Sequence, residues 1–180
     1  RTQLKSLHHE FGHTMIYVTH DQTEALTFAD KVVVMYDGRV VQMGTPQELF
    51  ETPQHTFVGY FIGSPGMNVL DATVTGDKAV IGGHEIDLGH GFAPLDGKVE
   101  LGVRPEFTRL ATGEAGLPVT IKRIEDVGRH KIVRADFNGS EINVIAEEGA
   151  EISPDMNRIV FDPAGVNVYA NSWRVAPQGA

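Results

Sequence analysis

The chain has 180 residues, a net charge of −9 and 41% hydrophobic residues, enough apolar material for one medium domain or two small ones. No Lys/Arg run interleaved with aromatic residues occurs, so the basic surface typical of nucleic-acid-binding proteins is missing. The absence of cysteine excludes a disulfide framework, and no apolar stretch approaches the roughly 20 residues needed to span a bilayer.

Two elements are predicted at the start of the chain. The helical spacing of Leu4, Leu7 and Phe11 predicts a helix that ends at Gly12. The unbroken apolar run from Met15 to Val18 then predicts a strand that is buried on both faces of a parallel sheet. Because such a sheet needs more strands than this part contains, the segment is interpreted as the last third of a larger α/β domain.

The first predicted helix ends in a sequence that fits the H-E-x-x-H pattern of zinc hydrolases, His9-Glu10-Phe11-Gly12-His13. That chemistry needs two His one helical turn apart on one face, with the Glu acting as base on a metal-bound water. Gly12 predicts that His13 lies in the turn, off the helix, and no third ligand is identifiable. A solvated helix end is therefore favoured, and a zinc hydrolase acting through His9 and His13 is the less favoured alternative.

A second helix is predicted to begin after Asp21 and to run to about Ala29. Asp21 and Glu24 predict a capping box, in which the Asp21 carboxylate caps free amides while Glu24 reaches back. His20 precedes this cap, at the carboxyl edge of the predicted strand, where open α/β sheets bind ligands. An imidazole there can donate to a phosphate oxygen, although a single His at a strand end is more often a hydrogen-bonded turn residue.

Turn and cap signals define the elements up to the middle of the chain. Asp37-Gly38 predicts a two-residue hairpin between two apolar strands. Thr45, followed by Pro46 and Glu48, predicts a capped helix, and Thr52-Pro53 predicts the start of another. The segment from Gly63 to Gly66 ends that helix and is interpreted as a linker.

From residue 68 onward the sequence predicts short strands separated by Gly, Asp and Asn turns. Asn138-Gly139 predicts a tight hairpin between two of them. Many short strands in one region are typical of a small barrel or sandwich. The strands are predicted near 69–75, 79–81, 84–88, 98–103, 117–127, 130–137, 140–146, 158–161 and 166–169.

The stretch from Thr14 to Ala25 closely resembles the switch region of ATP-binding cassette (ABC) ATPases, in which a strand, Thr-His-Asp and a helix follow in this order. Further along, Phe61 to Asn68 and Leu101 to Glu106 look like the subgroup that energises carbohydrate and glycerol-phosphate importers. Shorter matches to the ABC pattern occur at Ala29-Asp30-Lys31, Asp37-Gly38-Arg39 and Gly44-Thr45-Pro46.

The resemblance implies an α/β remnant of an ABC ATPase domain over residues 1–63, followed by an all-β regulatory barrel of oligonucleotide-binding (OB, TOBE/MOP-like) type over residues 64–180. It implies ATP and Mg²⁺ as cofactors of the parent protein. His20 would be the switch histidine that contacts the γ-phosphate and helps to hold the attacking water, and Asp21 would mainly cap its helix. The family's phosphate loop, glutamine loop, signature sequence and catalytic glutamate have no match, so the chain alone is expected to be inactive and to hold no cofactor.

The resemblance also implies partners: a homodimer, two transmembrane permease subunits and, indirectly, a solute-binding protein, with the subunit bound peripherally at the cytoplasmic face of the bacterial inner membrane. No nucleic-acid partner is expected. An alternative from another class is a regulatory module that binds a small oxyanion, although no Ser, Thr and Lys cluster converges on a Gly-rich loop. Arg104-Pro105-Glu106 is interpreted as a barrel corner. The transport interpretation depends on residues 14–36 folding as strand, helix, strand.

Overall fold

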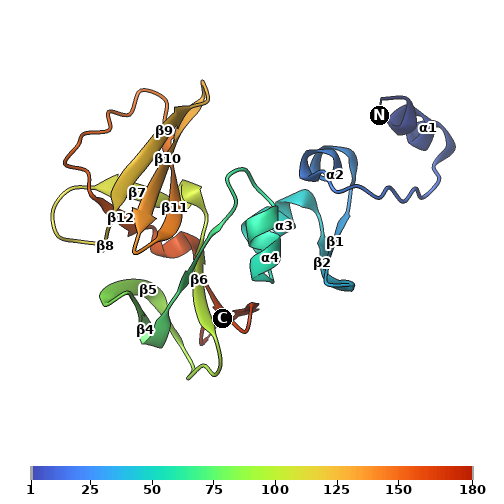
Figure 1. The fold of residues 1–180 in the computed structure, drawn as a ribbon. Helices are drawn as coiled ribbons and strands as arrows, with labels where there is room; N and C mark the ends of the chain where they lie inside the picture. The colour runs from blue at the N-terminus through green and yellow to red at the C-terminus, as the bar shows by residue number, and fades with distance from the viewer. Residues whose placement is uncertain (1, 180) are drawn as a thin grey trace.

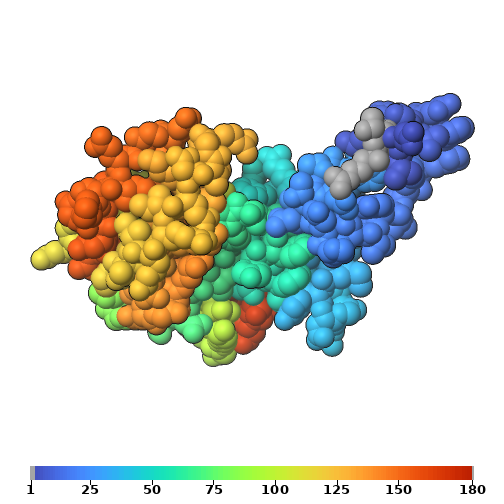
Figure 2. All heavy atoms as spheres, turned by 45° about the horizontal axis from the view of Figure 1, so that its top comes forward, coloured from blue at the N-terminus to red at the C-terminus, as the bar shows by residue number. Residues whose placement is uncertain are grey.

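The structure, a computed structural model, describes residues 2–179 and has two unlike parts (Figure 1). The helices lie toward one end of an elongated molecule, and the strands from β3 onward gather at the other end (Figure 2). Within the described residues, no helix is both long enough and apolar enough to cross a membrane.

The first helix, α1 (Thr2–Phe11), ends where the sequence predicts. Gly12 adopts a φ of +61°, a backbone conformation that favours glycine, and its N–H donates to the carbonyl of His8 at 2.8 Å. This bond closes the last helical turn. His13 therefore lies beyond the helix, as predicted.

The predicted strand from Met15 to Val18 is wrong. Residues 12–19 form neither helix nor strand, and the side chains of Ile16 and Val18 are 91% and 90% exposed. A strand requires neighbours that take its backbone hydrogen bonds, and no described strand lies beside this run. The expected order of strand, helix, strand over residues 14–36 therefore fails in its first element.

The second helix and the hairpin that follows it form as predicted, except that the capping box is incomplete. The N–H of Asp21, which Glu24 was expected to accept, donates to the Thr19 hydroxyl. Helix α2 (Gln22–Phe28) begins after Asp21, which occupies the N-cap position. Strands β1 (Val32–Tyr36) and β2 (Arg39–Gly44) pair antiparallel through a two-residue turn. Asp37 and Gly38 have φ values of 48° and 71°, as a type I′ turn requires.

Two short helices complete the helical part. Helix α3 (Pro46–Glu51) carries the predicted capping box, with Thr45 and Glu48 each bonding the other's backbone N–H. Helix α4 (Thr56–Phe61) begins later than the predicted start at Thr52-Pro53, because His55 is its N-cap and accepts from the N–H of Phe57 at 3.0 Å.

The β-rich part follows the predicted strands closely, with five differences. The segment 69–75 is divided between β3 and β4, the segment 79–81 is the end of β4 and not a separate strand, the segment 117–127 is divided between β8 and β9, and strands β7 and β14 were missed. The bounds are β3 (Asn68–Asp71), β4 (Thr73–Ile81), β5 (His84–Phe92), β6 (Val99–Val103), η1 (Pro105–Phe107), β7 (Thr108–Ala111), β8 (Leu117–Pro118), β9 (Thr120–Asp126), β10 (His130–Phe137), β11 (Ser140–Glu147), β12 (Arg158–Phe161), η2 (Pro163–Gly165), β13 (Val166–Ala170) and β14 (Trp173–Val175).

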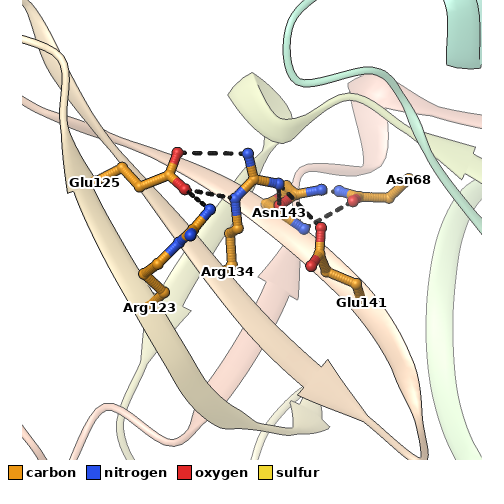
Figure 3. Close-up of polar contacts among 6 residues, drawn as sticks. All are labelled: Asn68, Arg123, Glu125, Arg134, Glu141 and Asn143. Carbon is orange, nitrogen blue, oxygen red and sulfur yellow. Dashed lines mark hydrogen bonds and ion pairs between the residues drawn. The ribbon is translucent and has the colours of Figure 1, made fainter.

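These strands form small antiparallel sheets, in the orders β14-β13-β6-β3, β11-β10-β9, β7-β12-β8 and β4-β5. The predicted hairpin at Asn138-Gly139 joins β10 to β11, with φ values of 50° and 84°. Asn68 connects two of the sheets, because its side chain donates to the carbonyl of Asn143 at 2.9 Å and accepts from its N–H at 2.8 Å (Figure 3). The Asn68 side chain thus bonds the backbone N–H and carbonyl of Asn143, which a neighbouring strand would otherwise bond.

Buried apolar side chains form two separate clusters. The smaller cluster lies in the helical part and includes Val34, Leu49 and Val58. The larger one extends through the β-rich part from Leu70 to Val168. A domain boundary at residue 64 remains a prediction, and each part has its own core.

Candidate functional site

His20 lies in a bend between the extended run and α2, and its side chain is exposed. Among the described residues, none forms a hydrogen bond or ion pair with the His20 side chain. The imidazole is therefore at the surface and accessible to another molecule. The predicted sheet edge beneath it is missing, because the strand from Met15 to Val18 does not form.

The residues on either side of His20 are held firmly. The Asp21 carboxylate accepts from the N–H groups of Thr23 at 2.8 Å and Glu24 at 3.2 Å, which confirms its predicted role as helix cap. The N–H of Asp21 donates to the Thr19 hydroxyl oxygen at 3.0 Å. The Thr19 hydroxyl in turn donates to the Glu24 carboxylate at 2.8 Å, and Tyr17 donates to the same carboxylate at 3.2 Å. The backbone that carries His20 is thereby tied to the first turn of α2.

A second contact ties the start of α2 to the connection between the two parts. The Gln22 side chain accepts from the N–H of Gly63 at 2.8 Å and donates to its carbonyl at 3.3 Å. The predicted linker from Gly63 to Gly66 is therefore bonded to the helical part at its first residue. The sequence contained no signal for this contact, because the two residues are 41 positions apart.

Arg104 joins the β-rich part to both short helices. Its side chain is 4% exposed, and it donates to the carbonyls of Phe50 and Ile62, each at 2.6 Å. Longer bonds reach the carbonyls of Gly59 at 3.4 Å and Leu49 at 3.5 Å. The predicted barrel corner is therefore wrong for Arg104, since these partners lie in and directly after α3 and α4.

The chemistry at Arg104 is that of a cation at the ends of helices. Carbonyls at a helix C-terminus lack intrahelical partners and carry partial negative charge, so a guanidinium is favoured there. The guanidinium also lies 3.9 Å from the ring centre of Phe50. Burial lowers the pKa of Arg104 to about 10, and the side chain stays protonated at neutral pH. A charged residue directly after the apolar run Leu101-Gly102-Val103 was the one sequence signal for this buried cation.

A second group of contacts joins α4 to the last strands. The Tyr169 hydroxyl donates to the carbonyl of Pro53 at 2.8 Å, and the N–H of Thr56 donates to Ser172 at 2.9 Å. The ring of His55 lies 4.8 Å from the Trp173 ring in a T-shaped contact.

Burial lowers the pKa of His55, while the Glu100 carboxylate raises it to a smaller extent. The two parts are therefore joined by polar contacts on both sides of α4.

The described residues contain no group of three or more His, Cys, Asp or Glu side chains able to hold a metal ion. His9 is in the last turn of α1 and His13 lies past its end, with the His13 ring stacked on that of Phe11 at 6.1 Å. The two His therefore do not share a helical face as the hydrolase pattern demands.

A cavity of about 530 Å³ lies in the β-rich part, between β7 and β11. Its charged side chains include more carboxylates than cations, which disfavours the oxyanion-binding alternative. The charged side chains at its walls are Glu106, Arg109, Arg129, Glu147, Glu148 and Glu151.

An ionic network crosses the sheet formed by β9, β10 and β11 (Figure 3). Arg134 donates to Glu125 at 3.0 Å, to Glu141 at 3.0 Å and to the side-chain oxygen of Asn143 at 3.1 Å. Arg123 forms an ion pair with the same Glu125 carboxylate. Every charged member of the network has a partner, so its role is to hold the three strands together.

Comparison with known proteins identifies relatives along nearly the whole chain. Residues 63–107 match the family described as the MalK OB fold domain. The chain is 40% identical over 177 residues to the sn-glycerol-3-phosphate import ATP-binding protein UgpC 1 of Rhizobium johnstonii, covering 94% of the chain and 48% of the relative.

Two further relatives belong to the same kind of protein. An ABC transporter ATP-binding protein of Sinorhizobium fredii, y4oS, is 40% identical over 163 residues, covering 86% of the chain and 42% of the relative. The sulfoquinovosyl glycerol transport ATP-binding protein SmoE of Agrobacterium fabrum is 36% identical over 180 residues, covering 94% of the chain and 49% of the relative. The chain thus spans about half the length of the curated relatives it matches. The strand at Met15 to Val18, on which the transport interpretation depended, does not form. The functional interpretation now rests on the similarity to these relatives.

Proposed function

We propose, from its similarity along nearly its whole length to sn-glycerol-3-phosphate import ATP-binding proteins, that the chain is the C-terminal part of an ATP-binding subunit of an ABC importer. The observation that carries the proposal is the pairing of a MalK-type OB match at residues 63–107 with similarity that also covers the helical part. In such a subunit, ATP hydrolysis is coupled to uptake of a solute of the glycerol-phosphate or sugar type.

The exposed apolar surface of the helical part supports its assignment to a larger ATPase domain. Met35, Val40 and Met43 on the hairpin are at least 58% exposed, in addition to Ile16 and Val18 on the extended run. Water-exposed apolar side chains in such number are typical of a surface that another part of the protein covers. We expect the remainder of an ATPase domain to pack here and to add the strands that the run from Met15 to Val18 lacks.

Within that domain, His20 is the residue to which we assign direct contact with ATP. Its exposed imidazole follows an extended segment and precedes a capped helix, with both neighbours held by hydrogen bonds. A ring carried on a backbone held in this way can donate to the γ-phosphate and orient the attacking water without a backbone movement. Mg²⁺ would neutralise the phosphate charge, held by residues outside this chain.

The supporting residues of the proposed subunit lie outside this chain as well. The phosphate loop, glutamine loop, signature sequence and catalytic glutamate are expected in the part of the subunit that corresponds to the half of the relatives that this chain does not cover. We propose two transmembrane permease subunits, a second copy of the subunit and, indirectly, a solute-binding protein as partners, with the subunit bound peripherally at the cytoplasmic face of the membrane. The chain by itself is expected to bind ATP weakly and not to hydrolyse it.

The test is ATP hydrolysis by the full-length subunit that contains this chain, assembled with its permease. We expect His20→Ala to lower the rate roughly 100-fold, the usual effect of removing one well-placed donor to a charged transition state, while binding of ATP persists. His13→Ala is the matched control, because His13 is also exposed and lies outside the helix. Hydrolysis by His20→Ala within twofold of the wild-type rate would refute the assignment.

A further inference from the structure

Two strand edges lie open toward the cavity between β7 and β11. Both strands are at the border of their sheets, since β7 pairs only with β12 and β11 pairs only with β10. The Thr108 hydroxyl connects them at one point, 3.1 Å from the carbonyl oxygen of Asn143. The cavity opens beside this point, and its walls include residues 108–110 of β7 and 144–147 of β11.

The hydrogen bonds of Asn143 show which backbone groups of β11 face away from β10. Both the N–H and the carbonyl of Asn143 are bonded by the Asn68 side chain, so they point out of the sheet. In an antiparallel pair the direction of these groups alternates along the strand. The N–H and carbonyl of Ile145, two residues on, therefore also point outward. Asn68 covers the edge at residue 143 and leaves it open at residue 145.

The same reasoning applies to β7. The N–H of Asp162 donates to the carbonyl of Phe107 at 2.9 Å, which places residue 107 on the side bonded to the chain that follows β12. With the register Thr108 to Phe161, residue 109 bonds toward β12 and residue 110 faces away. Leu110 and Ile145 each line the cavity. Among the described residues, no backbone partner takes their outward N–H and carbonyl groups.

The side chains around the cavity define the chemistry of an occupant. Apolar side chains contribute to the walls between the two strands, among them Val144, Ile152 and Met156. Four carboxylates and two arginines surround them, so the lining carries a net negative charge apart from His130. The volume of about 530 Å³ lies within the usual range of roughly 300–1,000 Å³ for ligand sites.

We propose that this cavity is a docking site for an extended, basic peptide segment of a partner protein, which adds as a strand to the open edge of β7 or β11. The open N–H and carbonyl groups of Leu110 and Ile145 supply the main-chain half of such recognition. Alternate side chains of the added strand enter the apolar wall, and the others reach the carboxylates. Lys or Arg at those positions complements the charge, whereas an acidic segment is repelled.

The experiment is selection of random peptides displayed on phage against the full-length subunit that contains this chain. We expect enriched peptides that alternate apolar residues with Lys or Arg, and at least tenfold weaker binding by the double variant Glu147→Lys/Glu148→Lys. Glu114→Lys is the matched control, because Glu114 is exposed and outside the cavity. Circular dichroism checks that each variant is folded.

Two further readouts separate strand addition from attraction of charge alone. Exchange of the backbone amide protons of Leu110 or Ile145 should slow at least tenfold when the selected peptide is bound. A copy of the peptide with N-methylated backbone amides should lose binding, although its charge is unchanged. The proposal is overturned if no peptide is enriched, if the enriched peptides are acidic, if charge reversal leaves binding unchanged, or if neither amide is protected.

Discussion

Replacing Arg104 with methionine tests whether a single buried cation holds the β-rich part against α3 and α4. Methionine preserves an unbranched apolar stem and removes all donors. Two bonds of 2.6 Å to the carbonyls of Phe50 and Ile62 are lost, and a hydrogen bond to a charged group contributes roughly 1.5–3 kcal/mol. The contact with the Phe50 ring adds about 0.5–2 kcal/mol. Relief from burying a charge offsets part of the loss, so we expect the free energy of unfolding to fall by about 3 kcal/mol.

Urea denaturation followed by tryptophan fluorescence measures this change in the free energy of unfolding, with a signal that comes from the contact between the two parts. The chain contains one tryptophan, Trp173, and its ring contacts His55 in the joint between the two parts. Arg129→Met is the control, because Arg129 is an exposed arginine of the β-rich part. If Arg104→Met unfolds at the same urea concentration as this control, the reasoning about the joint is wrong.

Two further predictions concern His55, at the contact between the two parts, and Asn68, at the contact between two sheets. Burial lowers the pKa of His55 below 6.5 in the folded chain. As the pH falls, His55 is therefore protonated in the unfolded chain before it is protonated in the folded chain. The stability that neutral His55 contributes is complete above about pH 6.5 and is lost as the pH drops through the folded-state pKa. Melting temperatures between about pH 5 and 8 should show this decline in the wild type and a shallower one in His55→Asn, which keeps a cap acceptor without titrating; equal slopes would contradict it. Asn68→Ala should lower the free energy of unfolding by roughly 1–3 kcal/mol, because the part-buried N–H of Asn143 loses its partner and its carbonyl keeps only the Thr108 hydroxyl. Thermal denaturation of this variant beside Asn157→Ala, at an exposed position, measures the effect, and equal stability of the two variants would argue against it.

The resemblance seen in the sequence agrees with the relatives found by comparison, whereas the structure contradicts the strand expected at Met15 to Val18 and the corner expected at Arg104. The stretch from Thr14 to Ala25 resembles the switch region of ABC ATPases, and the relatives of the chain are ATP-binding proteins, two of them named as import or ABC transporter proteins. The strand expected at Met15 to Val18 did not form. Its apolar pattern is typical of a strand with a neighbour on each side, and among the described residues no strand pairs with it. The role of His20 remains a prediction, because a γ-phosphate contact involves a ligand and residues beyond this chain.

The sequence by itself determined the hairpin turns, the caps at Asp21 and Thr45, and most strands. Asp37-Gly38 and Asn138-Gly139 make hairpins because their own backbones accept positive φ, and Thr45 caps a helix with a partner three residues away. Such interactions depend on neighbours in sequence, which any reader of the chain can see.

Only the tertiary structure decided how the two parts are joined and which strand edges stay open. Arg104 bonds carbonyls 42 to 55 residues away, and Asn68 covers one position of β11 from 75 residues away. No local pattern specifies such partners, because they are chosen by the path of the whole chain through space. The edges at Leu110 and Ile145 stay open for the same reason, because the path of the chain brings no other described strand beside them.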